Sequence, residues 1–139
     1  MAGTVNDVMT GDPRCVAKDA TLQDAAQQMR DADIGAILIV DGDSVAGIVT
    51  DRDIAIRGVA EGKDPGSTPV SDVGTSDVVT LSPDQSTDEA LSLMQQHDVR
   101  RLPVVQDGKP AGIVSLGDLS DQSGAGEALA DISDAPANN

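Results

Sequence analysis

Two stretches of the chain combine an apolar stripe at helical spacing with polar residues that can start a helix. The stripes are formed by Leu22, Ala25, Ala26 and Met29 in the first stretch and by Ala90, Leu91 and Met94 in the second. Thr21-Leu22-Gln23-Asp24 and Ser86-Thr87-Asp88-Glu89 open these stretches, and both resemble capping boxes, with Asp24 in place of the usual Glu or Gln. The pattern predicts two amphipathic helices, each with one buried face.

Each predicted helix is followed by two short apolar runs with a turn between them. The runs are residues 36–40 and 45–49 in the first half and residues 102–105 and 111–114 in the second. Asp41-Gly42-Asp43-Ser44 and Gln106-Asp107-Gly108-Lys109 separate them with residue types that tolerate the positive φ of hairpin turns. Weaker strand signals precede the helices around residues 14–16 and 78–81, and a second helical segment follows each pair of runs. The predicted order in each half is strand, helix, strand, strand, helix.

This order recurs because the chain repeats itself at a spacing of 65 residues. Gly47-Ile48-Val49-Thr50-Asp51-Arg52-Asp53 falls on Gly112-Ile113-Val114-Ser115-Leu116-Gly117-Asp118, and the register holds without a gap from residues 5–53 against 70–118. We therefore expect an α/β fold of two subdomains that are related by a pseudo-twofold axis and share one core, since each half is near the lower size limit for stable folding. The expected division is a first repeat at residues 1–62, a linker at 63–69, a second repeat at 70–121 and a disordered tail at 122–139.

Composition limits both the core and the partners. Hydrophobic residues make up 39% of the 139 residues and none is aromatic, so the core must consist of many small aliphatic contacts. A formal net charge of −15 repels nucleic acid and anionic membrane surfaces. No run approaches the roughly 20 apolar residues of a membrane helix, and the N-terminal residues show neither a basic region nor an apolar signal core. We expect a cytoplasmic protein that binds neither nucleic acid nor membrane.

The repeated motif has the composition of a nucleotide site. It reads glycine, two aliphatic residues, a hydroxyl residue, two variable residues and aspartate. Glycine lets a backbone approach a ligand closely, and the hydroxyl of Thr50 or Ser115 is placed at a predicted helix start, which favours an anion such as phosphate. One helical turn later, the carboxylate of Asp53 or Asp118 offers two acceptors that match the vicinal hydroxyls of a ribose. The same residues also have a purely structural interpretation as helix caps and first-turn acids.

Few residues in this chain could carry catalysis or bind a metal. His97 is the only histidine and closes a predicted helix, and no nucleophile with a neighbouring base is evident. Cys15 is the only cysteine, which excludes a disulfide within the chain and a cysteine metal cluster. We expect a protein that is not an enzyme and has no cofactor and no metal site. A redox-responsive dimer through Cys15 is a minor alternative.

The chain resembles the tandem cystathionine beta-synthase (CBS) domain family, the Bateman module, over residues 5–119. The resemblance is carried by Gly47-Ile48-Val49-Thr50-Asp51-Arg52-Asp53-Ile54, by Val99-Arg100-Arg101-Leu102-Pro103-Val104-Val105 and by Gly112-Ile113-Val114-Ser115-Leu116-Gly117-Asp118-Leu119. Within the family, Asp33-Ile34-Gly35-Ala36 and the residues 50–58 are similar to stand-alone actinobacterial proteins with two CBS domains.

The resemblance implies two clefts between the repeats, which in many members bind AMP, ADP, ATP or S-adenosylmethionine. It implies that Thr50 with Asp53, and Ser115 with Asp118, hold ribose and the proximal phosphate. Phosphates would meet Arg101, Arg100 and Arg52. The adenine would be flanked by Ile34, Gly35, Val99, Cys15 and Thr80.

These expectations lead to a non-enzymatic regulatory module that binds an adenine nucleotide, with AMP favoured over ATP because the chain is acidic, or S-adenosylmethionine. It would pass a conformational change to an effector protein that the sequence does not identify. The alternative is an interaction protein whose clefts are vacant. The family usually pairs into a flat dimer through its helices, so we expect a homodimer. Candidate contact residues are Ile54, Ile56, Val59 and Leu119.

Overall fold

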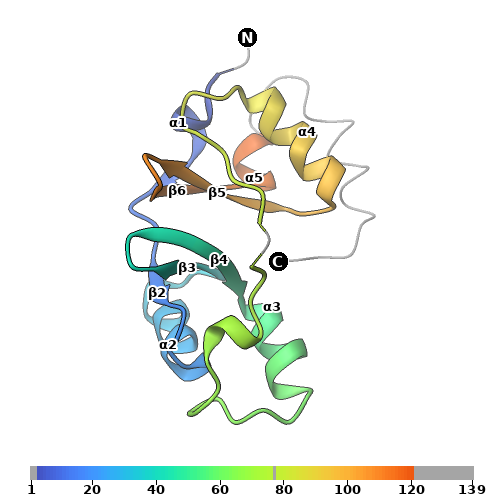
Figure 1. Cartoon of the computed structure of the whole chain (residues 1–139). Coiled ribbons are helices and arrows are strands. Elements are labelled where there is room, and N and C mark those ends of the chain that lie inside the picture. The colour runs from blue at the N-terminus through green and yellow to red at the C-terminus, as the bar shows by residue number, and fades with distance from the viewer. Residues whose placement is uncertain (1–2, 77, 121–139) are drawn as a thin grey trace. The chain divides into compact units, whose positions relative to one another are not determined.

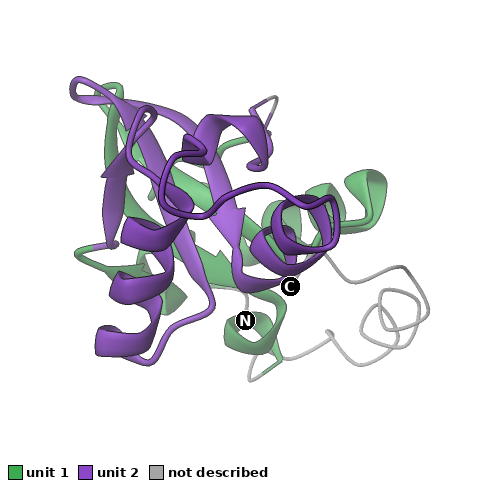
Figure 2. Cartoon of the chain, turned by 90° about the horizontal axis from the view of Figure 1, so that it is seen from below, with its two compact units in different colours: residues 1–12, 79–138 green, residues 13–78, 139 purple. Residues whose placement is uncertain are grey.

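The computed structural model describes residues 3–76 and 78–120, and the chain divides into two compact units. Unit 1 contains the described residues 3–12 and 79–120, and unit 2 contains residues 13–76 and 78 (Figure 2). The expected tail at residues 122–139 lies outside the described residues.

Unit 2 is a three-stranded sheet with a helix packed on one face (Figure 1). Its elements are β2 (Cys15–Ala17), α2 (Leu22–Ala32), β3 (Ala36–Asp41), β4 (Ser44–Thr50), α3 (Asp51–Asp53), the π-helix η1 (Ile54–Val59) and the 3₁₀ helix η2 (Val70–Asp72). The strand order is β2-β3-β4, with β2 parallel and β4 antiparallel to β3. Leu22, Ala25 and Met29 of α2 pack in one cluster with side chains of β3 and β4, including Ile37, Ile39 and Val49, whereas Ala26 of the predicted stripe is exposed.

Unit 1 repeats this plan with a different third strand. Its elements are α1 (Val5–Val8), β1 (Thr10–Gly11), α4 (Thr87–His97), β5 (Arg101–Gln106), β6 (Lys109–Ser115) and α5 (Leu116–Leu119). The strand order is β1-β6-β5, and both pairings are antiparallel. A single parallel bridge from Leu81 to Val104 stands where unit 2 has the pairing of β2 with β3.

The predicted helix starts and hairpins are confirmed. Thr21 caps α2 in a complete capping box, and the Ser86 hydroxyl accepts a hydrogen bond from the Glu89 backbone N–H at the start of α4. Both helices end at an aspartate with left-handed φ, Asp33 and Asp98, which are equivalent residues of the repeat. The predicted turns have positive φ at Gly42, Asp107 and Gly108. The signal around residues 78–81 produces only the bridge at Leu81, whereas its counterpart around 14–16 forms β2.

The segment that precedes each repeat's first helix crosses into the other unit. In unit 1, the Val5 backbone N–H donates to Gln85 O (2.8 Å), and Gly11 pairs with Gly112. In unit 2, the equivalent Val70 N–H donates to Ala20 O (2.7 Å). The compact units therefore differ from the sequence repeats, because the chain passes from one unit to the other near residues 12 and 78. The boundaries at residues 62 and 69 concern the sequence repeats and stay a prediction.

Each unit has its own buried cluster of hydrophobic side chains. The buried cluster of unit 1 is Val5, Leu81, Ala90, Met94, Leu102, Val104, Val114, Leu116 and Leu119. The buried cluster of unit 2 is Val16, Leu22, Ala25, Met29, Ile37, Ile39, Val49, Val70 and Val73. Val5 and Val70, supplied by the crossing segments, are fully buried, so each unit needs chain from both sides of the sequence to complete its core.

Candidate functional site

The glycine of each motif faces the chain's own backbone. A Cβ built on Gly47 would lie well inside contact distance of the Thr75 carbonyl oxygen, and one built on Gly112 would lie 2.6 Å from the Thr10 carbonyl oxygen. Thr75 bridges to Ile48 in unit 2, and Thr10 pairs with Ile113 in unit 1. The close approach that glycine permits is thus made by the crossing segment, and not by a ligand as the sequence reasoning supposed.

The hydroxyl residue and the aspartate of each motif are joined by two hydrogen bonds. In unit 2, the Thr50 backbone N–H donates to Asp53 Oδ2 (3.0 Å), and the Asp53 N–H donates to Thr50 Oγ1 (3.1 Å). In unit 1, the Ser115 N–H donates to Asp118 Oδ2 (2.8 Å), and the Asp118 N–H donates to Ser115 Oγ (3.1 Å). Both pairs are capping boxes at the strand-to-helix corner, as the structural interpretation expected.

The capping boxes limit what a ligand could use. Each box occupies one carboxylate oxygen, Oδ2, and two backbone N–H groups, those of the hydroxyl residue and of the aspartate. Within the described residues, no hydrogen bond reaches Oδ1 of Asp53 or Asp118, and both aspartates are partly exposed. Any ligand hydroxyl would therefore meet Oδ1 of a carboxylate whose orientation the box already fixes.

The strand beside each box carries the predicted arginines in one unit only. Arg101 lies directly opposite Ser115 in the β5–β6 ladder, and Ala36 lies opposite Thr50 at the same place in unit 2. Cross-strand neighbours project to the same face of a sheet, so Arg101 is on the side of the ladder that carries Ser115. Arg100 is the preceding residue, and its carbonyl accepts the Leu116 backbone N–H (2.7 Å).

Of the residues predicted to flank adenine, some lie beside the strand-to-helix corner of a capping box and others lie farther from it. Ile34 and Val99 follow helices α2 and α4, and their N–H groups donate to Met29 O and Met94 O (3.0 Å each). Gly35 follows Ile34, and its carbonyl accepts the Asp51 N–H (3.0 Å). Two more residues are farther away. Cys15 pairs with Leu38 two strands from Thr50, and Thr80 is exposed beside the bridge at Leu81.

The predicted site residues thus form two equivalent sets, one in each unit. The unit 2 set is Cys15, Ile34, Gly35, Thr50, Arg52 and Asp53. The unit 1 set is Thr80, Val99, Arg100, Arg101, Ser115 and Asp118. Arg52 is exposed on α3, and Gly117 replaces it in unit 1. Asp51, which the sequence analysis did not single out, lies beside Gly35, and its Oδ1 accepts the Arg52 backbone N–H (2.8 Å); the equivalent residue of the second motif is Leu116.

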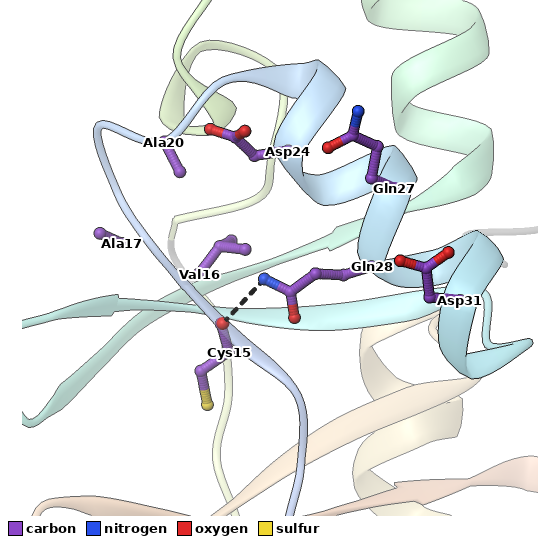
Figure 3. A pocket seen from close by; sticks show the side chains of 8 residues that line it. All are labelled: Cys15, Val16, Ala17, Ala20, Asp24, Gln27, Gln28 and Asp31. Carbon is purple, nitrogen blue, oxygen red and sulfur yellow. Dashed lines mark hydrogen bonds between the residues drawn. The ribbon is translucent and has the colours of Figure 1, made fainter.

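Cys15 lies at the edge of a groove between β2 and α2 (Figure 3). The groove encloses about 430 Å³ and is lined by Cys15, Val16, Ala17, Ala20, Asp24, Gln27, Gln28 and Asp31. Gln28 Nε2 donates to Cys15 O (3.5 Å), and the thiol donates to Pro13 O (3.4 Å). Burial raises the pKa of the Cys15 thiol, so little reactive thiolate forms at neutral pH, which argues against a redox-responsive dimer.

A metal site and a membrane-spanning helix have no support among the described residues. Across residues 3–76 and 78–120, no group of three or more His, Cys, Asp or Glu residues is placed to hold a metal ion. Across the same residues, none of the helices has the length and apolar character needed to cross a membrane. His97 is the exposed last residue of α4.

Two copies of one α/β unit, each with a hydroxyl–aspartate box at the corner after its hairpin, define a tandem-repeat protein of the CBS type. A model of the CBS domain matches residues 5–58 and 70–123, and the chain belongs to this family with two copies of the domain. The resemblance inferred from the sequence is thereby confirmed.

The relatives include stand-alone proteins of similar length. The chain is 42% identical over 134 residues to the CBS domain-containing protein YhcV of Bacillus subtilis, covering 94% of this chain and 95% of that protein. It is 38% identical over 118 residues to hypoxic response protein 1 of Mycobacterium tuberculosis, covering 84% of this chain and 82% of that protein, which confirms the actinobacterial likeness.

Solved structures agree with the fold. The crystal structure of Hypoxic Response Protein I with two coordinated zinc ions superposes with a TM-score of 0.78 at 37% identity, over 86% of this chain and 98% of that one. A hexameric CBS-CP12 protein from bloom-forming cyanobacteria superposes with a TM-score of 0.79 at 27% identity, over 91% of this chain and 75% of that one.

Proposed function

We propose that this protein is a non-enzymatic regulatory module that binds an adenine nucleotide or S-adenosylmethionine and transmits the binding to an effector protein. The observation that carries the proposal is the duplicated capping box, in which Asp53 and Asp118 each hold one carboxylate oxygen in a fixed, partly exposed position. The remaining oxygen, Oδ1, is suited to accept a hydrogen bond from a ribose hydroxyl. Membership of the CBS-domain family supports this reading.

AMP is the favoured nucleotide on electrostatic grounds. The formal net charge of −15 disfavours a highly charged triphosphate through long-range repulsion. A single phosphate needs less positive charge, and the arginines at positions 100 and 101 supply it beside the Ser115–Asp118 box. S-adenosylmethionine, which carries a positive sulfonium, is the alternative ligand.

Adding an adenine compound is expected to raise the melting temperature of the full chain by several degrees. A ligand selective for the folded state stabilises it by RT ln(1 + [L]/Kd), about 2.7 kcal/mol at a hundredfold excess over Kd. Calorimetric melts with millimolar AMP, ADP and S-adenosylmethionine measure the shift. Because the chain contains no Trp, Tyr or Phe, adenine that survives purification also shows as an isolated absorbance peak near 260 nm. A flat trace together with unchanged melts for all three compounds contradicts nucleotide binding and favours the interaction protein with vacant sites.

We also propose that the protein is a homodimer. Ile56 and Val59 on η1 are 52% and 62% exposed, so this short helix has two large aliphatic side chains in contact with water. One other expected contact residue is wrong, because Leu119 is 1% exposed in the core of unit 1, and Ile54 is partly buried against the core of unit 2. Burying Ile56 and Val59 against a second copy would remove this apolar surface from water.

Light scattering tests the dimer. At tens of micromolar protein we expect a mass of twice 14.1 kDa, and the double substitution of Ile56 and Val59 by serine is expected to yield monomer without loss of secondary structure. A wild-type mass of one chain refutes the dimer. A dimer that survives the double substitution places the interface elsewhere.

A further inference from the structure

The strand β2 forms one edge of the sheet of unit 2, and its backbone faces the groove between β2 and α2. The Lys18 N–H donates to Val40 O (3.0 Å) on the neighbouring strand β3. Adjacent residues of a strand direct their backbone groups to opposite sides, so the Ala17 N–H points away from β3. Ala17 is exposed and lines the groove, so its N–H is available at the sheet edge.

Unit 1 fills the equivalent position with an amide of its own. The Leu81 N–H donates to Pro103 O (2.9 Å), so the N–H of the next residue, Ser82, points away from β5. That N–H donates to Gln85 Oε1 (2.7 Å), and Gln85 Nε2 donates to Glu89 Oε2 in the first turn of α4 (3.2 Å). One side-chain amide therefore joins the strand edge to the start of the helix.

Unit 2 has the same local backbone but lacks this amide. The repeat spacing makes Ala17, Ala20 and Asp24 the equivalents of Ser82, Gln85 and Glu89. The Ala20 N–H donates to Ala17 O (2.9 Å), just as the Gln85 N–H donates to Ser82 O (3.2 Å), so the turn after the strand is shared. The methyl group of Ala20 can make neither of the two side-chain hydrogen bonds.

The missing amide leaves a donor and an acceptor at the end of the groove where α2 begins (Figure 3). Among the described residues, no side chain accepts from the Ala17 N–H. Asp24 Oδ2 accepts the Thr21 N–H (3.1 Å) in the capping box, and Oδ1 remains for another donor. An occupant that matches this end of the groove must carry an acceptor for Ala17 and a donor for Asp24.

The charge of the groove favours a basic occupant. Its lining includes Asp24 and Asp31 and contains no Lys, Arg or His. Arg30 pairs with Asp31 (2.9 Å), but both side chains are largely exposed, where such a pair contributes little. With a formal net charge of −15, the chain attracts basic segments and repels acidic ones.

We propose that the β2–α2 groove docks an extended basic segment of a partner protein along the edge of β2. A backbone carbonyl of the segment accepts the Ala17 N–H, as Gln85 Oε1 accepts the Ser82 N–H in unit 1. A Lys or Arg side chain of the segment donates to the Asp24 carboxylate. In such strand addition, main-chain hydrogen bonds give affinity and side chains give specificity. This inference is independent of nucleotide binding.

Titration of the isotope-labelled full chain with a capped pentapeptide of alternating lysine and valine tests the docking. Saturable shifts of the Ala17 and Asp24 amide NMR signals are expected at up to about 1 mM peptide. The same pentapeptide with glutamate in place of lysine is expected to bind at least about tenfold more weakly. Absence of saturable shifts at these amides, or equal binding of the two peptides, overturns the proposal.

An exchange of one residue between the repeats separates docking from general charge attraction. Ala20→Gln places the amide of unit 1 in the groove without changing the net charge. It is expected to slow hydrogen exchange at the Ala17 N–H and to weaken binding of the lysine peptide by about tenfold. Ala60→Gln makes the same change at an exposed position outside the groove and is expected to alter neither. In unit 1, Gln85→Ala is expected to speed hydrogen exchange at the Ser82 N–H.

A second variant decides the question if Ala20→Gln fails to fold. Asp24→Asn retains an oxygen for the Thr21 N–H, removes the charge and is expected to weaken the lysine peptide by about tenfold. Asp43→Asn makes the same charge change in the exposed hairpin turn of the same unit and is expected to leave binding unchanged. Unchanged binding in Asp24→Asn, or in a folded Ala20→Gln variant, overturns the docking proposal and leaves the proposed nucleotide binding standing.

Discussion

Replacing Gly47 by alanine is expected to lower the free energy of unfolding by about 2–4 kcal/mol. The added methyl group would meet the Thr75 carbonyl oxygen, which is backbone and cannot turn aside as a flexible side chain would. The crossing segment must then move away from β4, which weakens the two hydrogen bonds between Ile48 and Thr75 (3.0 and 2.9 Å). Urea unfolding followed by circular dichroism measures the change.

Two further alanine variants make the result specific. Gly112→Ala is expected to cost a similar amount, because its Cβ would lie 2.6 Å from the Thr10 carbonyl oxygen. Gly11→Ala is the matched control: Gly11 pairs with Gly112, but a Cβ there would meet nothing within 4 Å, so the expected change is within about 0.5 kcal/mol. If all three variants are equally stable, the close approach of the crossing segments does not explain the motif glycines.

Asp118→Ala is expected to weaken AMP binding by about ten- to a hundredfold, and Asp53→Ala by at most about threefold. Both substitutions remove a carboxylate that could accept ribose hydroxyls, but only Asp118 lies in the unit with Arg100 and Arg101. Both also remove one of the two hydrogen bonds of a capping box of the same geometry, so their effects on stability are expected to match at about 1 kcal/mol each. Calorimetric titration with AMP gives the two affinities.

Because the two alanine variants are expected to lose the same stability, a difference in their AMP affinity does not come from unfolding. Asp118→Asn adds a second control: an amide oxygen can still accept the Ser115 N–H and the backbone N–H of residue 118 still donates to Ser115 Oγ, so the box is kept while the charge is lost. Intermediate AMP affinity in this variant separates the charge of Asp118 from its capping role. Equal loss of affinity in Asp53→Ala and Asp118→Ala removes the asymmetry between the two sets.

Local chemistry made the helix starts, hairpins and corner boxes predictable. Thr21 and Ser86 need only the residues three positions later to cap their helices, and Thr50 and Ser115 are satisfied in the same way. Because the chain repeats, each element predicted in one half was also expected at the equivalent residues of the other half. What the sequence left open was whether the Thr50–Asp53 and Ser115–Asp118 pairs cap a helix or hold a ligand, since one spacing serves both.

Contacts distant along the chain were beyond local patterns. The burial of Leu119 and the partial burial of Ile54 depend on which face of a short helix meets the core, and fewer than two turns show no reliable stripe. The position of the Asp51 carboxylate beside Gly35 likewise depends on folding, which brings the two residues together across the strand-to-helix corner.

By itself, the sequence determined a duplicated α/β unit with an aliphatic core, because periodicity, capping and repetition are properties of neighbouring residues. Only the tertiary structure decided which chain segments complete each unit. Val5 joins residues of the second repeat and Val70 joins residues of the first, since a buried valine contributes wherever its side chain is excluded from water. The motif glycines are also explained only by the tertiary structure. The carbonyl oxygens of Thr75 and Thr10, which are distant in sequence, lie so close to Gly47 and Gly112 that a side chain would not fit.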